Sequence, residues 1–153
     1  MGIRALQEYL HQHIPLSKAM QVTVLAATES GVTLSAPLAP NINHRETVFG
    51  GSASAVAILS AWALLYVRLE RAGVQGRVVI RRNTMRYELP MTDTFTALAS
   101  PPDSAAWDRF LSTLGRRRPA RVVVKSVLYC KGVKAGELEG EFVALPGPPH
   151  AIS

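Results

Sequence analysis

Asn41 to Gly73 is the stretch that decides the fold, and it opens with Asn41-Ile42-Asn43-His44-Arg45-Glu46-Thr47-Val48-Phe49-Gly50-Gly51-Ser52. It continues as Ala53-Ser-Ala-Val-Ala-Ile-Leu-Ser-Ala-Trp62-Ala-Leu-Leu-Tyr66-Val-Arg-Leu-Glu-Arg-Ala72-Gly73. The second part is rich in Ala and Leu and contains no Pro, which predicts a helix, and Gly73 stands where a left-handed C-terminal cap would end it. No charge occurs between Ala53 and Tyr66. A helix that is apolar on all sides is buried, so we expect it to be the centre of the fold.

The predicted helix begins at a glycine pair. Glycine allows another group to approach the backbone closely. The first amides of a helix have no partner inside the helix, and they lie at the positive end of its dipole. Gly50, Gly51 and Ser52 could therefore donate N–H groups to a carbonyl oxygen or to a developing oxyanion. The alternative interpretation is that the glycines only let a loop enter the helix tightly.

The rest of the chain predicts one sheet around this helix. Apolar spacing indicates a first helix over Ile3–His13, ended by Pro15, whose His11 and His13 we expect to be exposed and uninvolved. Residues 18–28 and 32–38 alternate as an antiparallel hairpin, and a loose tail follows Pro146. The remaining elements are strands over 77–89, 94–99, 121–130 and 134–145, and a short helix over 104–114 capped by Asp103 or Ser104.

We therefore expect an α+β fold, with a curved, mainly antiparallel sheet of about six strands wrapped around one long central helix. Such a sheet has open edge strands, which a homodimer would cover.

Composition limits the class of protein. A chain of 153 residues with 48% apolar side chains is expected to form one domain, residues 1–153. The one cysteine, Cys130, excludes an internal disulfide and fits a reducing compartment, and no His or Cys spacing suggests a metal site. There is no signal-peptide pattern, and the apolar run 53–67 is shorter than the roughly 20 residues that span a bilayer. We expect a cytoplasmic protein that uses no membrane.

The net charge of +6 is unevenly distributed, since twelve Lys or Arg and four Asp or Glu lie between Arg77 and Lys134. This excess favours an anionic partner, such as a nucleotide-bearing cofactor, an acidic carrier protein or nucleic acid. The arginines are not interleaved with aromatic residues and match no nucleic-acid-binding motif, so we expect no nucleic acid partner.

The element order and the spacing Asn43-x6-Gly50-Gly51 resemble the hotdog-fold thioesterases. The chain is most similar to the thioesterase domain that follows a GNAT acetyltransferase domain in some bacterial proteins, and here we expect the thioesterase module alone. The resemblance is carried by segments 14–20, 36–44 and 47–52 and by Ala61-Trp62. It implies an acyl thioester substrate carried on coenzyme A or acyl carrier protein, and a place in fatty acid metabolism. It also implies a homodimer, possibly paired into a tetramer, with the active site at the dimer interface beside the start of the central helix, and no cofactor beyond the substrate.

The resemblance also assigns roles to residues. Asn43 matches a loop asparagine that helps to hold the substrate or a water, and Gly50 and Gly51 match the helix-start pair, whose second amide polarises the thioester carbonyl. Phe49 stands where many relatives have histidine, and we expect Ser52 to assist Gly51. The acyl chain would lie along the central helix, past Ala53, Ala57 and Trp62 and the strand residues Met85 and Tyr87.

Two expectations are specific to this chain. Many relatives carry an acidic residue about two turns into the helix, but here that region reads Val56-Ala57-Ile58-Leu59-Ser60. We therefore expect the proton acceptor to be Glu46, then His44, with Asp93 as a third candidate. Candidates for binding the phosphates of coenzyme A, or a carrier surface, are Arg81, Arg82 and Arg117, together with Arg116, Arg118 and Arg121.

The missing carboxylate leaves another class open, a non-catalytic dimeric module that binds acyl-CoA or an acyl carrier. A hotdog dehydratase or hydratase is less favoured, because the His and acid motif of those enzymes is not found.

Overall fold

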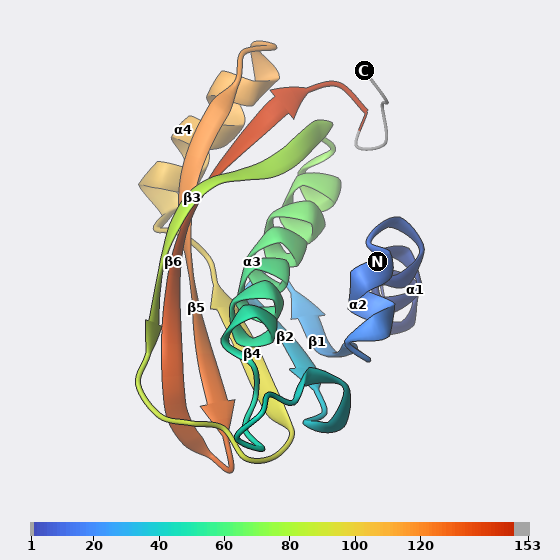
Figure 1. The fold of residues 1–153 in the computed structure, drawn as a ribbon. Coiled ribbons are helices and arrows are strands. Elements are labelled where there is room, and N and C mark those ends of the chain that lie inside the picture. The colour runs from blue at the N-terminus through green and yellow to red at the C-terminus, as the bar shows by residue number, and fades with distance from the viewer. Residues whose placement is uncertain (1, 149–153) are drawn as a thin grey trace.

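The computed structural model describes residues 2–148 of the chain, and it has the predicted architecture of one curved sheet around one long helix (Figure 1). Six antiparallel strands lie in the order β1-β2-β4-β5-β6-β3. This is the hotdog fold. In chain order the elements are α1 (Ile3–His13), α2 (Pro15–Ala19), β1 (Thr23–Thr28), β2 (Gly31–Ala36), the 3-10 turn η1 (Ala39–Asn41), α3 (Gly50–Ala72), β3 (Gly76–Tyr87), β4 (Phe95–Ser100), α4 (Ser104–Gly115), β5 (Ala120–Cys130) and β6 (Val133–Pro146).

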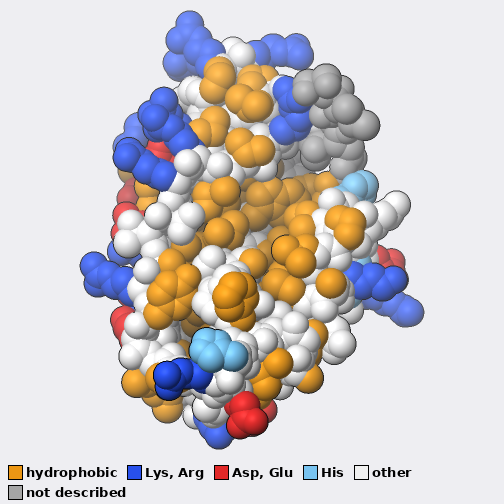
Figure 2. Space-filling view, in the orientation of Figure 1, with side chains coloured by type: hydrophobic (Ala, Val, Ile, Leu, Met, Phe, Trp, Pro, Cys, Tyr) orange, Lys and Arg blue, Asp and Glu red, His pale blue; other side chains and the backbone are white. Residues whose placement is uncertain are grey.

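The long helix α3 lies between the sheet and the two N-terminal helices (Figure 1). It ends at Gly73, whose φ of 68° is the predicted left-handed cap. By length and composition α3 could span a bilayer, but 61% of its most apolar window is buried inside the fold. The expectation that α3 is buried on all sides is wrong for one stripe. Ala55, Ile58, Trp62 and Tyr66 are only partly covered, and Figure 2 shows apolar side chains gathered in a hollow on this side of the molecule.

The N-terminal region contains a second helix, α2, that was not predicted from the sequence. Pro15 ends α1 as predicted, but it also stands at the first turn of α2, where its fixed φ and its missing N–H are tolerated. The strand expected from Lys18 therefore begins only at Thr23.

Side chains of α1 bind the outer edge of β1. Gln7 Oε1 accepts a hydrogen bond from Val24 N–H at 2.9 Å, and His11 Nε2 donates one to Val22 O at 2.8 Å. The His13 ring lies against the Tyr9 ring, with centroids 4.3 Å apart. His11 is therefore partly buried and bonded instead of exposed and uninvolved, whereas His13 is exposed as expected. Because α1 closes the β1 edge of the sheet, the longer strand β3 is left at the opposite edge without a strand partner among the described residues.

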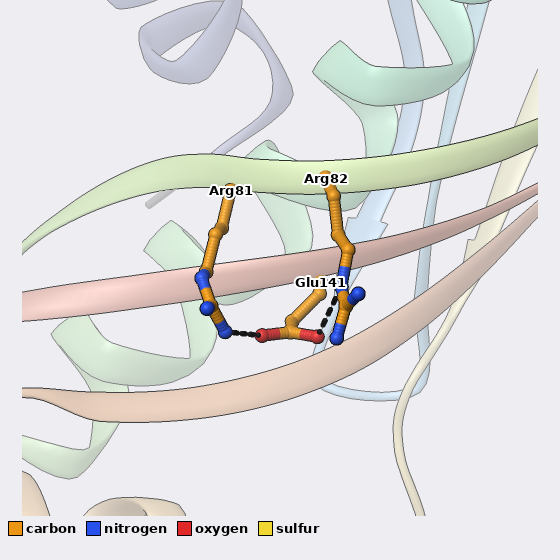
Figure 3. Close-up of polar contacts among 3 residues, drawn as sticks. All are labelled: Arg81, Arg82 and Glu141. Carbon is orange, nitrogen blue, oxygen red and sulfur yellow. Dashed lines mark hydrogen bonds and ion pairs between the residues drawn. The ribbon is translucent and has the colours of Figure 1, made fainter.

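A β-bulge interrupts β3 at Arg81. The pairing with β6 steps from Ile80–Phe142 directly to Arg82–Glu141, so Arg81 is the extra residue. Arg81 Nη1 and Arg82 Nε consequently both reach the Glu141 carboxylate, at 2.8 and 3.2 Å (Figure 3). Hydrogen bonds from the two guanidinium groups hold the pKa of Glu141 below its usual range.

The helix α4 fills a gap in the sheet. β4 pairs only with the second half of β5, from Lys125 onward, and α4 packs against the first half. Trp107, Phe110 and Leu114 of α4 join the core, and Asp103 caps the helix by accepting from Ala106 N–H at 2.8 Å, as predicted. β6 ends at Pro146, and residues 149–153 of the expected tail lie outside the described part of the chain.

Candidate active site

The loop before α3 is a small hairpin. Ile42 and Val48 form an isolated antiparallel bridge, and Phe49 N–H donates to Asn41 O at 2.7 Å. Val48 N–H donates to Met91 O at 2.9 Å, which ties this hairpin to the loop between β3 and β4. The hairpin therefore enters α3 along a defined path rather than as an irregular loop.

Asn43 shapes the tip of this hairpin. Its Oδ1 accepts hydrogen bonds from Arg45 N–H at 2.9 Å and from Thr47 N–H at 3.1 Å. Its Nδ2 donates to Thr47 Oγ1 at 2.9 Å. Because two acceptor positions and one N–H are used inside the loop, only one N–H of the Asn43 amide remains for a substrate or a water.

Glu46 and His44 lie at the tip, and both are exposed. Glu46 has a positive φ of 64°, which completes the turn. Neither Glu46 nor His44 lines the cavity beside the start of α3 that is described below.

The N-terminus of α3 is open. Among the described residues, no side chain caps it, and the first bond of the helix runs from Ala53 N–H to Phe49 O at 3.0 Å. The amides of Gly50, Gly51 and Ser52 precede that bond and have no acceptor within the helix. Gly51 is exposed, and the ring of Phe49 lies beside it.

Two aromatic rings flank the glycine pair. A Cβ on Gly51 would lie 2.3 Å from Cε2 of Phe49, and a Cβ on Gly50 would lie 3.5 Å from Cε1 of Tyr87. The Tyr87 hydroxyl donates to Gly50 O at 3.3 Å. Phe49 and Tyr87 are 55% and 60% exposed, so both rings are available to a substrate.

A cavity of about 290 Å³ adjoins this helix start, and one of its lining residues is acidic. This residue, Glu88, forms an ion pair with Lys134 at 3.5 Å. Its position was not predicted from strand alternation, because β3 ends at Tyr87 instead of continuing to Leu89 as expected. The other lining residues are Val48, Gly50, Ala53, Tyr87, Leu89, Pro90, Met91, Leu128 and Ala135.

The arginines proposed for phosphate binding lie elsewhere in the same chain. Arg117 follows α4 and lines a cavity with Gly73, at the far end of α3. A helix of 23 residues is about 34 Å long, so Arg117 does not reach the glycine pair of its own chain. Arg81 and Arg82 are held by Glu141. Asp93, the third candidate for the base, accepts from Thr94 N–H at 2.7 Å and is also exposed.

The partly covered stripe of α3 borders an apolar groove of about 260 Å³. Ile58 and Trp62 form one wall and Ile80 and Phe142 the other, and Ile14, Leu16 and Met20 close it from the N-terminal side. Ser60 is turned away from this groove, since it is fully buried and bonded to Ser126 Oγ at 2.6 Å. No group of three or more metal-binding side chains occurs within residues 2–148.

A family described as "Putative thioesterase (yiiD_Cterm)" matches residues 3–146. A Shewanella oneidensis protein of solved structure, described as a "putative thioesterase", is 32% identical, with a TM-score of 0.86 over 94% of this chain and 97% of that one. A Chlorobaculum tepidum protein is 23% identical, with a TM-score of 0.88 over 94% of both chains. A Haemophilus influenzae thioesterase is 14% identical, with a TM-score of 0.76 over 95% of this chain and 92% of that one.

The Chlorobaculum tepidum and Haemophilus influenzae structures are less than 25% identical to this chain in sequence, and they show a shared fold only. Together with the open helix start, the matches define a hotdog-fold protein of the thioesterase type. The chain belongs to the family described as yiiD_Cterm thioesterases.

Proposed function

We propose that this protein hydrolyses acyl thioesters at the start of α3, with the acyl group carried on coenzyme A or on acyl carrier protein. One observation carries the proposal: the amides of Gly51 and Ser52 open a buried apolar helix and have no capping side chain among the described residues. Two such donors at a helix N-terminus can stabilise the oxyanion that forms when water attacks a thioester carbonyl. The family match supports the same reaction class.

The acyl chain would occupy the apolar groove along Ile58 and Trp62. Its volume of about 260 Å³ suits a short or medium chain, and its lining is apolar on every side that the described residues provide. Of the residues expected along the chain's path, Trp62 lines this groove, while Ala53 and Tyr87 line the neighbouring cavity beside Glu88.

The working form would be a homodimer joined along β3, with pairing into a tetramer as a further possibility. α1 closes the other edge of the sheet through Gln7 and His11, so β3 offers the free row of backbone groups. The hollow beside Trp62 is also left for a second copy to cover. Such a partner could bring its own Glu46 or arginines toward the glycine pair. A monomer by light scattering at working concentrations would contradict this arrangement.

Activity is tested by offering short-, medium- and long-chain acyl-CoAs and following thiol release. The donor amide is tested in a Phe49→Ala background, where the ring no longer obstructs Gly51. Gly51→Pro deletes the N–H at a helix position that tolerates proline, and Gly51→Ala is the matched control that keeps it. We expect kcat to fall by about 100-fold in the proline variant relative to the alanine variant, the usual loss for one oxyanion donor. Equal activity of the two would remove Gly51 from the mechanism.

The proton acceptor is tested separately. Glu46→Gln, His44→Ala and Glu88→Gln each remove one candidate, and Asn43→Ala tests the loop that carries the first two. We propose Glu46 of the partner copy or Glu88 of the same chain as the base. Only Glu88 lines the cavity at the helix start within one chain. Full activity of both glutamine variants would exclude both carboxylates.

A second candidate function is an acyl-thioester binding module without turnover. It is favoured by the absence of any Asp or Glu from Gly50 to Leu69, so that α3 presents no carboxylate along the groove. Saturable binding of a non-hydrolysable acyl-CoA analogue, with no thiol released from any acyl-CoA, would decide for this function.

A further inference from the structure

A second concave site lies between α4 and the side chains of β5 that point away from α3. It is a cleft of about 710 Å³, within the size range of small-molecule sites. Burial alternates along β5, with Ala120, Val122 and Val124 in the core, so that residues of odd number point into the cleft. We call it the basic cleft, and the side chains used below are Arg109 and Thr113 of α4, Arg121, Val123 and Lys125 of β5, and Pro101.

Three cationic side chains of the basic cleft are available to bind a ligand. Arg109, Arg121 and Lys125 take part in none of the ion pairs found among residues 2–148, and all three are exposed. The other charged groups of the cleft are already engaged. Arg82 and Glu141 bind each other, and the Asp103 carboxylate accepts from Ala106 N–H. Three uncommitted cations therefore converge on one hollow from two separate elements.

The side chains that line the basic cleft indicate the chemical class of its ligand. Two guanidinium groups and an ammonium suit the oxygens of phosphate groups, which arginine binds in a bidentate manner. Beside them Val123 is 43% exposed and, with Pro101, Pro102 and Ala106, forms an apolar surface. A ligand with phosphates at one end and a flat apolar ring at the other fits both parts.

The basic cleft is separate from the start of α3. Leu128 of β5 lines the cavity beside Gly50, whereas Arg121 lines the cleft. Seven residues of extended strand separate the two, about 23 Å. The cleft side chains also point away from α3, whose start lies on the opposite face of the sheet.

We propose that the basic cleft is a binding site for a phosphorylated small molecule of the nucleotide class, with the phosphates on Arg109, Arg121 and Lys125 and the ring against Val123. The proposal does not depend on thioester hydrolysis. A free nucleotide and the nucleotide end of coenzyme A share this chemistry, and the test includes both.

The test is calorimetric titration of the whole chain with inorganic pyrophosphate, ADP and coenzyme A. We expect saturable binding of pyrophosphate and tighter binding of ADP, because ADP adds the ring contact. Arg109→Ala/Arg121→Ala should weaken binding at least tenfold. The matched control is Arg4→Ala/Arg71→Ala, which removes the same charge from exposed positions of α1 and α3, outside the cleft. Tighter binding of coenzyme A than of ADP would identify coenzyme A as the ligand of the basic cleft. The reverse order would identify a free nucleotide as the ligand.

Two results would overturn the proposal. One is the absence of saturable binding of all three probes to the wild-type protein. The other is an equal loss in the cleft variant and in the control variant, which would make binding a matter of net charge alone. Should the double cleft variant fail to fold by thermal unfolding, Lys125→Gln removes one cleft cation while keeping most of the side chain, and it should still weaken pyrophosphate binding.

Discussion

The ring of Phe49 folds back over Gly51, at a position where a Cβ on Gly51 would lie 2.3 Å from Phe49 Cε2. The two residues should therefore be energetically coupled. Gly51→Ala should be less favourable in the wild-type protein than in a Phe49→Ala background, by about 0.5–1 kcal/mol, the usual size for side chains in contact. Urea unfolding of the two single variants and the double variant measures this coupling. Additive effects would mean that the ring moves aside without cost.

The buried pair Ser60 and Ser126 should behave as a unit. Ser60 Oγ donates to Ala57 O at 2.8 Å, so Ser126 is the donor in the 2.6 Å bond between the two hydroxyls. Ser60→Ala leaves the Ser126 hydroxyl buried without its acceptor and should destabilise the fold by about 1–3 kcal/mol. Ser60→Ala/Ser126→Ala should cost less than the two single changes added together. Ser54→Ala, on the partly exposed side of α3, is the control and should be near neutral.

The contact between α1 and β1 can be tested through Gln7. Gln7→Ala removes the acceptor of Val24 N–H and should lower the free energy of unfolding by about 1 kcal/mol. Gln12→Ala makes the same chemical change on the exposed side of α1 and should have little effect. Thermal or urea unfolding distinguishes the two. If both variants match the wild-type protein, water replaces Gln7 at the sheet edge without loss.

The Glu141 carboxylate should titrate below the ordinary glutamate range of about 4.3, because Arg81 and Arg82 hydrogen-bond its charged form. A depressed folded-state pKa contributes stability above the unfolded pKa, and that contribution is lost as the pH falls through the folded pKa. The melting temperature of the wild-type protein should therefore exceed that of Glu141→Gln at neutral pH, and the gap should close in acid. Carbon-detected NMR titration should also show the pKa rising in Arg82→Ala. Glu139→Gln removes a carboxylate from the same strand that has no ion pair among the described residues, and it is the control for the loss of charge.

Much of the fold could be predicted from local chemistry. The cap at Gly73, the six strands and the Asp103 cap each depend on short-range rules that a sequence carries openly. The helix α2 was missed because Pro15 was interpreted only as a stop, although proline also starts helices. The partly covered stripe at Trp62 was missed because an apolar surface does not say whether its own chain or another one covers it.

The candidate site was less predictable. The glycine pair and its uncapped amides could be predicted, since they follow from helix geometry. The proximity of Tyr87 to Gly50, and of Glu88 to the same cavity, depends on where β3 ends relative to α3. That is a long-range property of the packed sheet, and no local pattern contains it. The internal bonds of Asn43 likewise became visible only once the hairpin was closed.

The bulge at Arg81 also affects a part of β3 that is distant from the Glu141 carboxylate. In an unbroken strand, side chains alternate strictly, so the row begun by Val78 and Ile80 on the helix side would continue through Arg86. The additional residue at the bulge moves the odd-numbered side chains that follow it to the helix side, so that Tyr87 contacts Gly50 instead. If the same residues paired without the bulge, Tyr87 would turn away from the glycines and Arg86 would face the apolar interior. The pairing register at the edge of the sheet thus decides which side chain meets the start of α3.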